Sequence, residues 1–212
     1  MPCLCTFNQR GIILISLNGA KISGLICGIE LIDQGFNVEI FEKRQEIGNP
    51  INGPGIINEL SKDEKRICTA RETKIGWALR REWFEKNLAK KFLNKGGVIH
   101  LKSKPPPNSH NTNNIHKKTW YGGVTIEENK PNNFIIDSIN GNNLCFKRGD
   151  GLIECWSDIE LPNMKNGWLE KIQGKHPEDI NKLTINREID EGQSIAQKII
   201  RLIGGEIKHD SR

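Results

Sequence analysis

The stretch Gly11-Ile-Ile-Leu-Ile-Ser-Leu-Asn-Gly-Ala-Lys-Ile-Ser-Gly24 decides the fold that the sequence predicts. It begins with a continuous apolar run, residues 11–17, which is typical of a buried parallel strand. A turn of small residues follows, and the chain then shows the three- and four-residue spacing of a helix with a wide apolar face. The apolar residues at that spacing are Ile22, Leu25, Ile26, Ile29 and Ile32. Residues 36–41 alternate as a second strand and are followed by Glu42, so the sequence predicts a βαβ unit with a right-handed crossover.

The rest of the chain changes its pattern twice. Apolar residues four apart predict a helix from Arg81 to Leu93, and a third short strand is expected at Val98–Leu101. Residues 104–118 are rich in proline and polar residues, which is typical of a linker or a long surface loop. Short strands are expected at 119–126, 134–139, 144–146 and 152–156, with Asn140-Gly141 as a hairpin turn, and a helix is expected from Pro177 to Ile203 with a break near Gly192.

These elements predict an α/β protein with a Rossmann-like βαβ dinucleotide-binding domain, a small antiparallel β segment and a C-terminal helix. We expect four parts along the chain. They are a dinucleotide-binding part (1–103), a linker or surface loop (104–118), an abbreviated antiparallel β segment (119–176) and a C-terminal helical part (177–212).

Composition excludes several classes of function. The formal net charge is +5 over 212 residues, and the charges are interspersed, which argues against a nucleic-acid partner. No apolar run approaches the roughly 18 residues of a membrane span, so we expect a cytoplasmic protein, with peripheral membrane contact left open. Cys3 and Cys5 form an isolated C-x-C pair, and the histidines are scattered, so no metal site is expected. The sequence does not indicate an oligomeric state.

The pattern Gly19-x-Lys21-x-x-Gly24, with Glu42 following Gly19 by 23 residues, matches the dinucleotide-binding fingerprint at three of its positions. In that fingerprint the first glycine permits a tight turn, and the third lets the helix pack close to the strand. The helix N-terminus offers free N–H groups to phosphate, and an acid at the end of the second strand accepts hydrogen bonds from the adenosine ribose.

Three quoted segments resemble the FAD-binding part of flavin-dependent oxidoreductases, in particular the geranylgeranyl reductase and aromatic-hydroxylase group. They are Gly19-Ala-Lys-Ile-Ser-Gly-Leu25, Gly35-Phe-Asn-Val-Glu-Ile-Phe-Glu-Lys-Arg44 and Arg81-Glu-Trp-Phe-Glu-Lys-Asn-Leu-Ala89. The resemblance covers roughly residues 11–101, about half of the chain, and it implies FAD as the cofactor and an apolar substrate such as a prenyl lipid.

The fingerprint and the resemblance together indicate the residues of the site. Gly19, Ala20 and Gly24 would contact the pyrophosphate and Glu42 the ribose, and the charged Lys43 at the end of the strand is a candidate contact for a phosphate. Arg81 would lie near the cofactor, and Asp150, in Arg148-Gly-Asp-Gly151, would contact the ribityl chain. No side chain is identified as an acid or a base.

Two departures from the family leave alternatives open. Lys21 stands where the family has its second glycine, and its side chain either obstructs the pyrophosphate or bends away and pairs with a phosphate. The gap between Gly149 and Gly192 is longer than in the family, and the antiparallel part is abbreviated. Two functions therefore remain, an FAD-dependent oxidoreductase or a truncated, non-catalytic relative that keeps the scaffold as a binding or regulatory module. NAD is the alternative cofactor, because Glu42 would serve either ribose.

Overall fold

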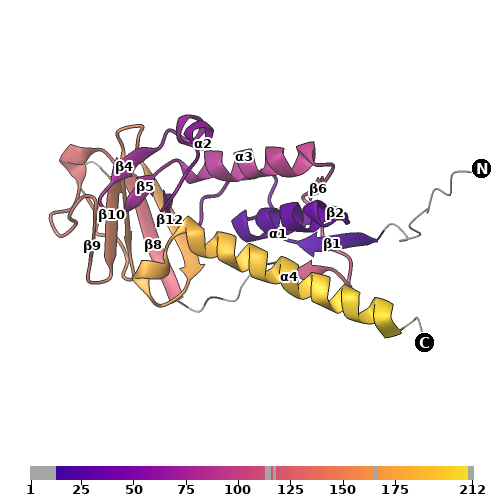
Figure 1. The fold of residues 1–212 in the computed structure, drawn as a ribbon. Coiled ribbons are helices and arrows are strands. Elements are labelled where there is room, and N and C mark those ends of the chain that lie inside the picture. Colours follow the sequence, from indigo (N-terminus) through magenta and orange to yellow (C-terminus); the bar gives the residue numbers. More distant parts are fainter. Residues whose placement is uncertain (1–12, 113–115, 117, 165–166, 210–212) are drawn as a thin grey trace, which may run out of the picture.

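The computed structural model describes residues 13–112, 116, 118–164 and 167–209, and its amino-terminal half contains the predicted βαβ unit (Figure 1). β1 (Leu14–Asn18) leads through α1 (Ile22–Asp33) to β2 (Asn37–Glu42), and β1 and β2 pair in parallel. β6 (Val98–Leu101) and β7 (His110–Asn111) extend the sheet to the order β6-β2-β1-β7, with every pair parallel. The α/β class and the parallel sheet are confirmed.

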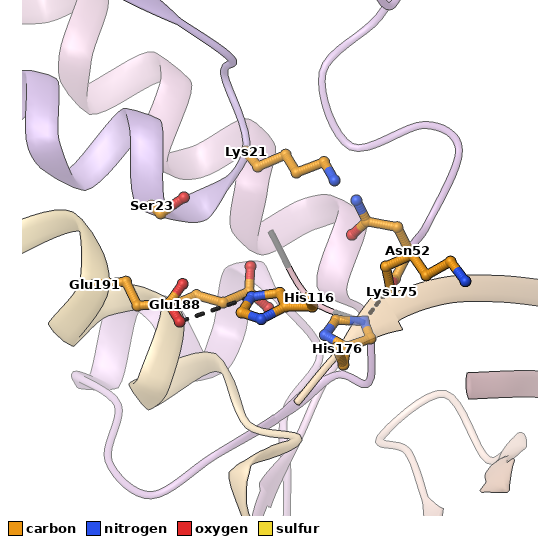
Figure 2. Close-up of a pocket in the computed structure, with 8 residues that line it drawn as sticks. All are labelled: Lys21, Ser23, Asn52, His116, Lys175, His176, Glu188 and Glu191. Atoms are coloured by element: carbon orange, nitrogen blue, oxygen red, sulfur yellow. Dashed lines mark hydrogen bonds and ion pairs between the residues drawn. The ribbon is translucent and has the colours of Figure 1, made fainter. Parts of the chain in front are cut away.

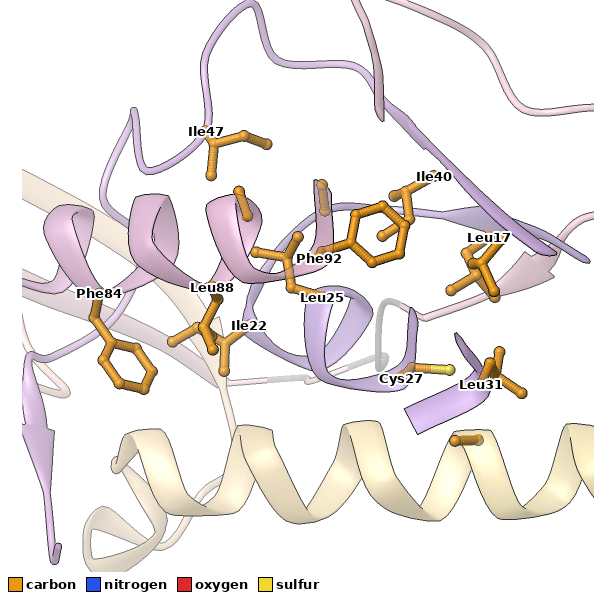
Figure 3. Close-up of a cluster of buried hydrophobic side chains, with 14 of the residues drawn as sticks. Leu17, Ile22, Leu25, Cys27, Leu31, Ile40, Ile47, Phe84, Leu88 and Phe92 are labelled. Carbon is orange, nitrogen blue, oxygen red and sulfur yellow. The ribbon is translucent and has the colours of Figure 1, made fainter. Parts of the chain in front are cut away.

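Three helices build the larger core with this sheet. α1 packs against both α3 (Arg81–Asn94) and α4 (Ile185–His209), and Figure 1 shows it between them. The core holds fully buried aliphatic and aromatic side chains, several of which are drawn in Figure 3: Leu17, Ile22, Leu25, Leu31, Ile40 and Phe92. Each such side chain contributes roughly 1.5–3 kcal/mol through the removal of apolar surface from water, so this core holds α1 firmly against the sheet.

The second half of the chain forms a five-stranded antiparallel sheet with the order β12-β8-β11-β10-β9. Its strands are β8 (Lys118–Thr125), β9 (Ser138–Asn140), β10 (Asn143–Lys147), β11 (Ile153–Ser157) and β12 (Glu170–His176). The predicted hairpin turn is present one residue later than expected, because Asn140 pairs with Asn143 and the loop is Gly141-Asn142, with Gly141 at a φ of +58°. Trp120, Phe146 and Trp156 are fully buried in a second core that this sheet shares with the residues around β3 and β5.

A few short elements were not predicted. α2 (Lys62–Ile67) begins with a capping box between Ser61 and Glu64, and a small antiparallel sheet has the order β3-β5-β4. Its strands are β3 (Ile56–Ile57), β4 (Arg71–Thr73) and β5 (Gly76–Ala78), and two 3₁₀ turns span Glu127–Asn129 and Ile180–Lys182. Only two or three residues long, these strands show too little alternation to be found from sequence.

The segment 104–118, predicted as a linker or surface loop, contains the two-residue strand β7, which pairs with β1 at the edge of the parallel sheet. The expected bounds of the C-terminal helix are wrong. The C-terminal helix begins at Ile185 rather than at Pro177, and it runs through Gly192 without a break. A Cβ on Gly192 would lie 2.5 Å from the carbonyl oxygen of Ser23, so this glycine allows close packing of α4 on α1 instead of ending the helix.

The thiols that the structure describes, Cys27, Cys68, Cys145 and Cys155, are free and buried. Burial raises the pKa of Cys27 and of Cys68 to about 12, so both are neutral at physiological pH. Cys3 and Cys5 lie outside the described residues. Among the helices that are described, none has the length and apolar character that a crossing of the bilayer requires.

Candidate functional site: a dinucleotide turn and a polar cavity

The glycine turn of the fingerprint connects β1 to the first turn of α1. Gly19 has a φ of +108°, a conformation that residues with a side chain rarely adopt. A Cβ on Gly24 would lie only 1.9 Å from the carbonyl oxygen of Gly19 and 2.8 Å from Oγ1 of Thr112. Both positions therefore require glycine. Gly19, the first glycine of the fingerprint, permits the turn, and Gly24, the third, permits the close approach of helix and strand. The unpaired N–H groups of the first helical turn lie directly after this turn.

Lys21 occupies the N-cap position of α1 in an extended conformation, with φ −75° and ψ 179°. Any residue adopts this conformation, so the backbone does not require glycine here. The first turn of α1 carries no acidic side chain, and Lys21 makes no side-chain cap. The departure from the fingerprint at Lys21 therefore concerns the volume and charge of its side chain only.

Glu42 lies at the carboxyl end of β2, beside the glycine turn, and its side chain is almost fully buried. Its Oε2 accepts the backbone N–H of Ala20 at 2.8 Å, and its Oε1 accepts the backbone N–H of Arg44 at 3.0 Å. The guanidinium of Arg44 donates to Oε2 at 3.1 Å and to the carbonyl oxygen of Ala20 at 3.2 Å. These contacts lower the pKa of Glu42 despite its burial, which on its own would raise it. Glu42 is therefore a carboxylate at neutral pH.

A chain of alternating buried charges runs from Arg44 to α4. Glu85 of α3 accepts hydrogen bonds from Arg44 at 3.2 Å and from Nε of Arg81 at 3.1 Å. Arg81 also donates to Glu188 of α4 at 2.6 Å and to the carbonyl oxygen of Pro54 at 3.3 Å. Arg81 and Glu85 are each 1% exposed, so neither charge has water as a partner. This network fixes the start of α3 and the first turns of α4 relative to the end of β2.

The network also sets the charge states of its members. Burial alone would lower the pKa of Arg81, but the carboxylates of Glu188 and Glu85 outweigh it and raise that pKa. Burial alone would raise the pKa of Glu188, but the charge of Arg81 and its hydrogen bond outweigh it and lower that pKa. Both groups are therefore ionised in the folded protein. The attraction between them offsets the free-energy cost of burying each charge.

A cavity of about 80 Å³ lies between the start of α1, the end of β12 and the first turns of α4 (Figure 2). Its lining is polar and consists of Lys21, Ser23, Asn52, His116, Lys175, His176, Glu188 and Glu191. Figure 2 shows the Lys21 side chain extending from the start of α1 toward Asn52. The cavity brings together groups that are far apart in the sequence, from the amino-terminal turn and from the last strand and helix.

His176 is held in its neutral form at this cavity. Its ring is 6% exposed, lies edge-on to Trp156, and its Nε2 is 2.5 Å from the carbonyl oxygen of Asn52. A carbonyl oxygen can only accept, so Nε2 carries the proton of the neutral ring. Burial lowers the pKa of His176 to about 4. The pKa of the neighbouring His116 is also lowered, by burial and by the charge of Arg187.

The low pKa of His176 predicts a pH-dependent stability. Between its folded pKa of about 4 and the unfolded value of about 6.5, the unfolded chain binds more protons, so stability falls as the pH decreases through this window. We expect a loss of roughly 3 kcal/mol in the free energy of unfolding from this histidine. Urea unfolding at pH 7 and pH 4 should show a smaller difference in His176→Gln than in the unchanged protein. Equal differences in the two proteins would contradict this prediction.

The structure brings most of the predicted site residues together. Gly19, Ala20, Gly24 and Glu42 lie together where β1 leads into α1, beside the carboxyl end of β2. Arg81 does not line the cavity but is linked to Glu42 through the buried charges of the network.

Two predicted residues lie elsewhere. Lys43 is exposed after the end of β2. Asp150 lies at the tip of the turn between β10 and β11, where it accepts from Arg148 at 2.8 Å and lies 3.9 Å from the guanidinium of Arg80. Gly149 beside it packs against the carbonyl oxygen of Thr69. Asp150 therefore takes part in an ion cluster beside the small sheet and is not among the cavity residues.

Several site residues were not identified from the sequence. Thr112 lies inside the segment predicted as a linker, yet its Oγ1 is 2.8 Å from the carbonyl oxygen of Asn18 and 2.9 Å from that of Gly19. His116, His176 and Glu188 belong to no recognisable motif, and only their placement in the fold makes them neighbours. The described residues contain no group of three metal-binding side chains.

Neither a protein-family model nor a curated protein sequence matches the chain. Solved structures are similar to it. A geranylgeranyl bacteriochlorophyll reductase-like protein from Thermoplasma acidophilum has a TM-score of 0.56 and 13% identity, over 90% of this chain and 80% of that one. A Diels-Alderase of pyrroindomycin biosynthesis has a TM-score of 0.48 and 11% identity, over 77% of this chain and 55% of that one.

An aromatic hydroxylase of angucycline biosynthesis has a TM-score of 0.45 and 9% identity, over 78% of this chain and 53% of that one. The chain thus spans about half the length of these last two proteins. The similarity to the Thermoplasma protein covers 90% of this chain, whereas the sequence motifs cover about half of it. It confirms, at the level of the fold, the resemblance to the geranylgeranyl reductase-like group.

Proposed function

We propose that this chain binds FAD and acts as a flavin-dependent oxidoreductase. The observation that carries the proposal is the turn between β1 and α1, in which Gly19 and Gly24 are required by the backbone and Glu42 lies beside them. This arrangement suits a pyrophosphate at the start of α1 and an adenosine ribose at the end of β2. The fold shared with the geranylgeranyl bacteriochlorophyll reductase-like protein supports flavin rather than NAD as the dinucleotide.

The donors and acceptors at the turn fit such a ligand. An ionised carboxylate has about four lone-pair positions, and Glu42 uses three of them for Ala20 and Arg44. One position on Oε1 remains for a ribose hydroxyl, so Glu42 can accept this hydrogen bond without losing a contact. The N–H groups of the first turn of α1 and the absence of acidic side chains there suit the phosphates.

The bound flavin would supply the redox chemistry, and the protein would position it and exclude water. The neutral His176 lines the cavity between α1, β12 and α4 and lies edge-on to the buried Trp156, so we place the substrate on this side of the cofactor. An apolar substrate such as a prenyl lipid is part of the proposal and is supported by the resemblance to geranylgeranyl reductases.

The small volume of the cavity bears on how a dinucleotide would enter and on the alternative function of the chain. About 80 Å³ is well below the roughly 300–1,000 Å³ of common cofactor and ligand pockets, so the lining side chains must move before a whole dinucleotide can enter. A protein in which they do not move would keep the fold as a binding or regulatory module without flavin chemistry. Calorimetric titration with FAD tests both candidates. Saturable binding with a 1:1 stoichiometry supports the flavoprotein, and no binding by the folded chain supports the module.

Glu42→Ala should weaken FAD binding by about ten- to hundredfold, because one hydrogen bond to a charged acceptor, worth roughly 1.5–3 kcal/mol, is lost. The dissociation constant from the same calorimetric titration measures the effect. If NAD binds, it would use the same ribose contact, so a competition titration between FAD and NAD ranks the two cofactors.

Glu59→Ala is the matched control, since Glu59 is an exposed glutamate outside the site. Glu42 also holds Ala20 and Arg44, so the circular dichroism spectrum of each variant must match that of the unchanged protein before titration. An unaltered dissociation constant in folded Glu42→Ala would contradict the assignment of Glu42 to the ribose.

A further inference from the structure

An ammonium group without a direct bonding partner among the described residues lies at the start of α1. Lys21 is half-buried, and within the described residues its ammonium group makes no hydrogen bond and no ion pair. The carboxylates whose charge acts on it, Glu188 and Glu85, are already bonded to arginines of the buried network. The charge of Lys21 is therefore balanced only at a distance, by a network in which three carboxylates (Glu42, Glu85 and Glu188) bond to two guanidinium groups.

The surroundings of Lys21 make this charge unfavourable. A helix N-terminus carries the positive end of the helix dipole, where a cation is destabilising and an anion is stabilising. The guanidinium groups of Arg44 and Arg81 add further positive charge. Burial and these two charges lower the pKa of Lys21, although the carboxylates of Glu188 and Glu85 act in the opposite direction. An anion at the start of α1 would offset the repulsion from the two guanidinium groups and from the helix dipole.

We propose that Lys21 binds the pyrophosphate of the dinucleotide and replaces, through its charge, the close backbone contact of the missing second glycine. This inference rests on the proposed function, because it takes the dinucleotide as the anion. The flexible side chain lines the cavity and extends from the start of α1 toward Asn52 (Figure 2). Its ammonium group has three N–H donors, none of them used within the described part of the chain, for phosphate oxygens.

The neighbouring cationic side chains do not replace Lys21 in this role. Lys175 lines the same cavity, but its ammonium group is hydrogen-bonded to Thr119. His116 contacts Arg187, and its pKa is lowered by burial and by that arginine, so its ring is neutral at physiological pH. Lys21 is therefore the cavity residue that offers an uncommitted positive charge.

The test compares Lys21→Met, Lys21→Arg and Lys21→Gly with Lys90→Met, a control that removes the same charge from an exposed position on α3. FAD and ADP are titrated calorimetrically at about 50 and 200 mM salt, since the screening of charges differs between these conditions. Lys21→Met and Lys21→Gly should weaken the binding of both ligands by about ten- to hundredfold, as expected for a lost charge-assisted hydrogen bond. Lys21→Arg and Lys90→Met should bind as the unchanged protein does.

The outcomes separate this inference from the proposed function. FAD binding that stays the same in Lys21→Met, or becomes tighter in Lys21→Gly, overturns the role of Lys21 and leaves the flavoprotein standing. ADP binding that depends on Lys21, without FAD binding, supports the role of Lys21 and overturns the flavin assignment. An unchanged protein that binds neither ligand overturns both. Circular dichroism confirms folding of each variant, and the extended backbone at Lys21 accepts all three replacements.

Discussion

Arg81→Met is expected to lower the free energy of unfolding by about 3–5 kcal/mol, because it leaves buried carboxylates without their cation. Arg81 bonds Glu85 and Glu188 and is itself 1% exposed, so water cannot replace the lost partner. Methionine fills similar space, which confines the change to the charge and the hydrogen bonds. Urea denaturation followed by circular dichroism measures the effect.

The second variant in this experiment is the double substitution Arg81→Met with Glu188→Gln. Glu188→Gln removes the carboxylate charge that has lost Arg81, so the double variant should recover part of the lost stability. The interaction energy between the two positions should exceed about 1 kcal/mol. Arg66→Met is the control, since its ion pair with Asp63 is exposed and should contribute no more than about 1 kcal/mol. A loss below 1 kcal/mol in Arg81→Met would contradict the structural role of the buried network.

Gly24→Ala is expected to destabilise the fold by about 3 kcal/mol and to abolish retention of FAD. The added methyl group would lie 1.9 Å from the carbonyl oxygen of Gly19, so α1 must move away from β1 to accept it. That movement displaces the first turn of α1, which is where the pyrophosphate would bind. Urea denaturation and the calorimetric titration with FAD measure the two effects.

Gly35→Ala is a matched control for this substitution. Gly35 has a φ of +87°, but a Cβ there meets no atom within 4 Å, so only the cost of the left-handed conformation, about 1 kcal/mol, is expected. FAD binding should be unaffected in this control. If Gly24→Ala were no more destabilising than Gly35→Ala, the close approach of α1 to β1 would be disproved.

The sequence was sufficient for the βαβ unit because its signals are local. The apolar run before Gly19 and the helical spacing after it are confirmed as β1 and α1, and Glu42 lies beside the glycine turn as predicted. The same locality explains the failure at Gly192, where a glycine inside a helical pattern was interpreted as a break. Gly192 allows α4 to pack against Ser23. This contact joins segments that are distant in the sequence, so the local pattern of residues does not indicate it.

The cavity could not be predicted for the same reason. His176 and Glu188 reach the cavity because β12 and α4 return to the start of α1, and His116 joins them from the segment between β7 and β8. Asp150 is a different case. The structure places the Gly-Asp pair at a hairpin tip beside Arg148, so its contact with a ribityl chain stays a prediction. At Gly19 and Gly24, by contrast, the expected strand and helix surround the motif.

The most direct test of the central claim is the visible absorption spectrum of the purified protein after incubation with excess FAD and desalting. The account predicts a retained flavin band near one flavin per chain, which Gly24→Ala would lack and Gly35→Ala would keep. A protein that is folded by circular dichroism but stays colourless after this treatment would contradict the assignment of the chain as a flavoprotein.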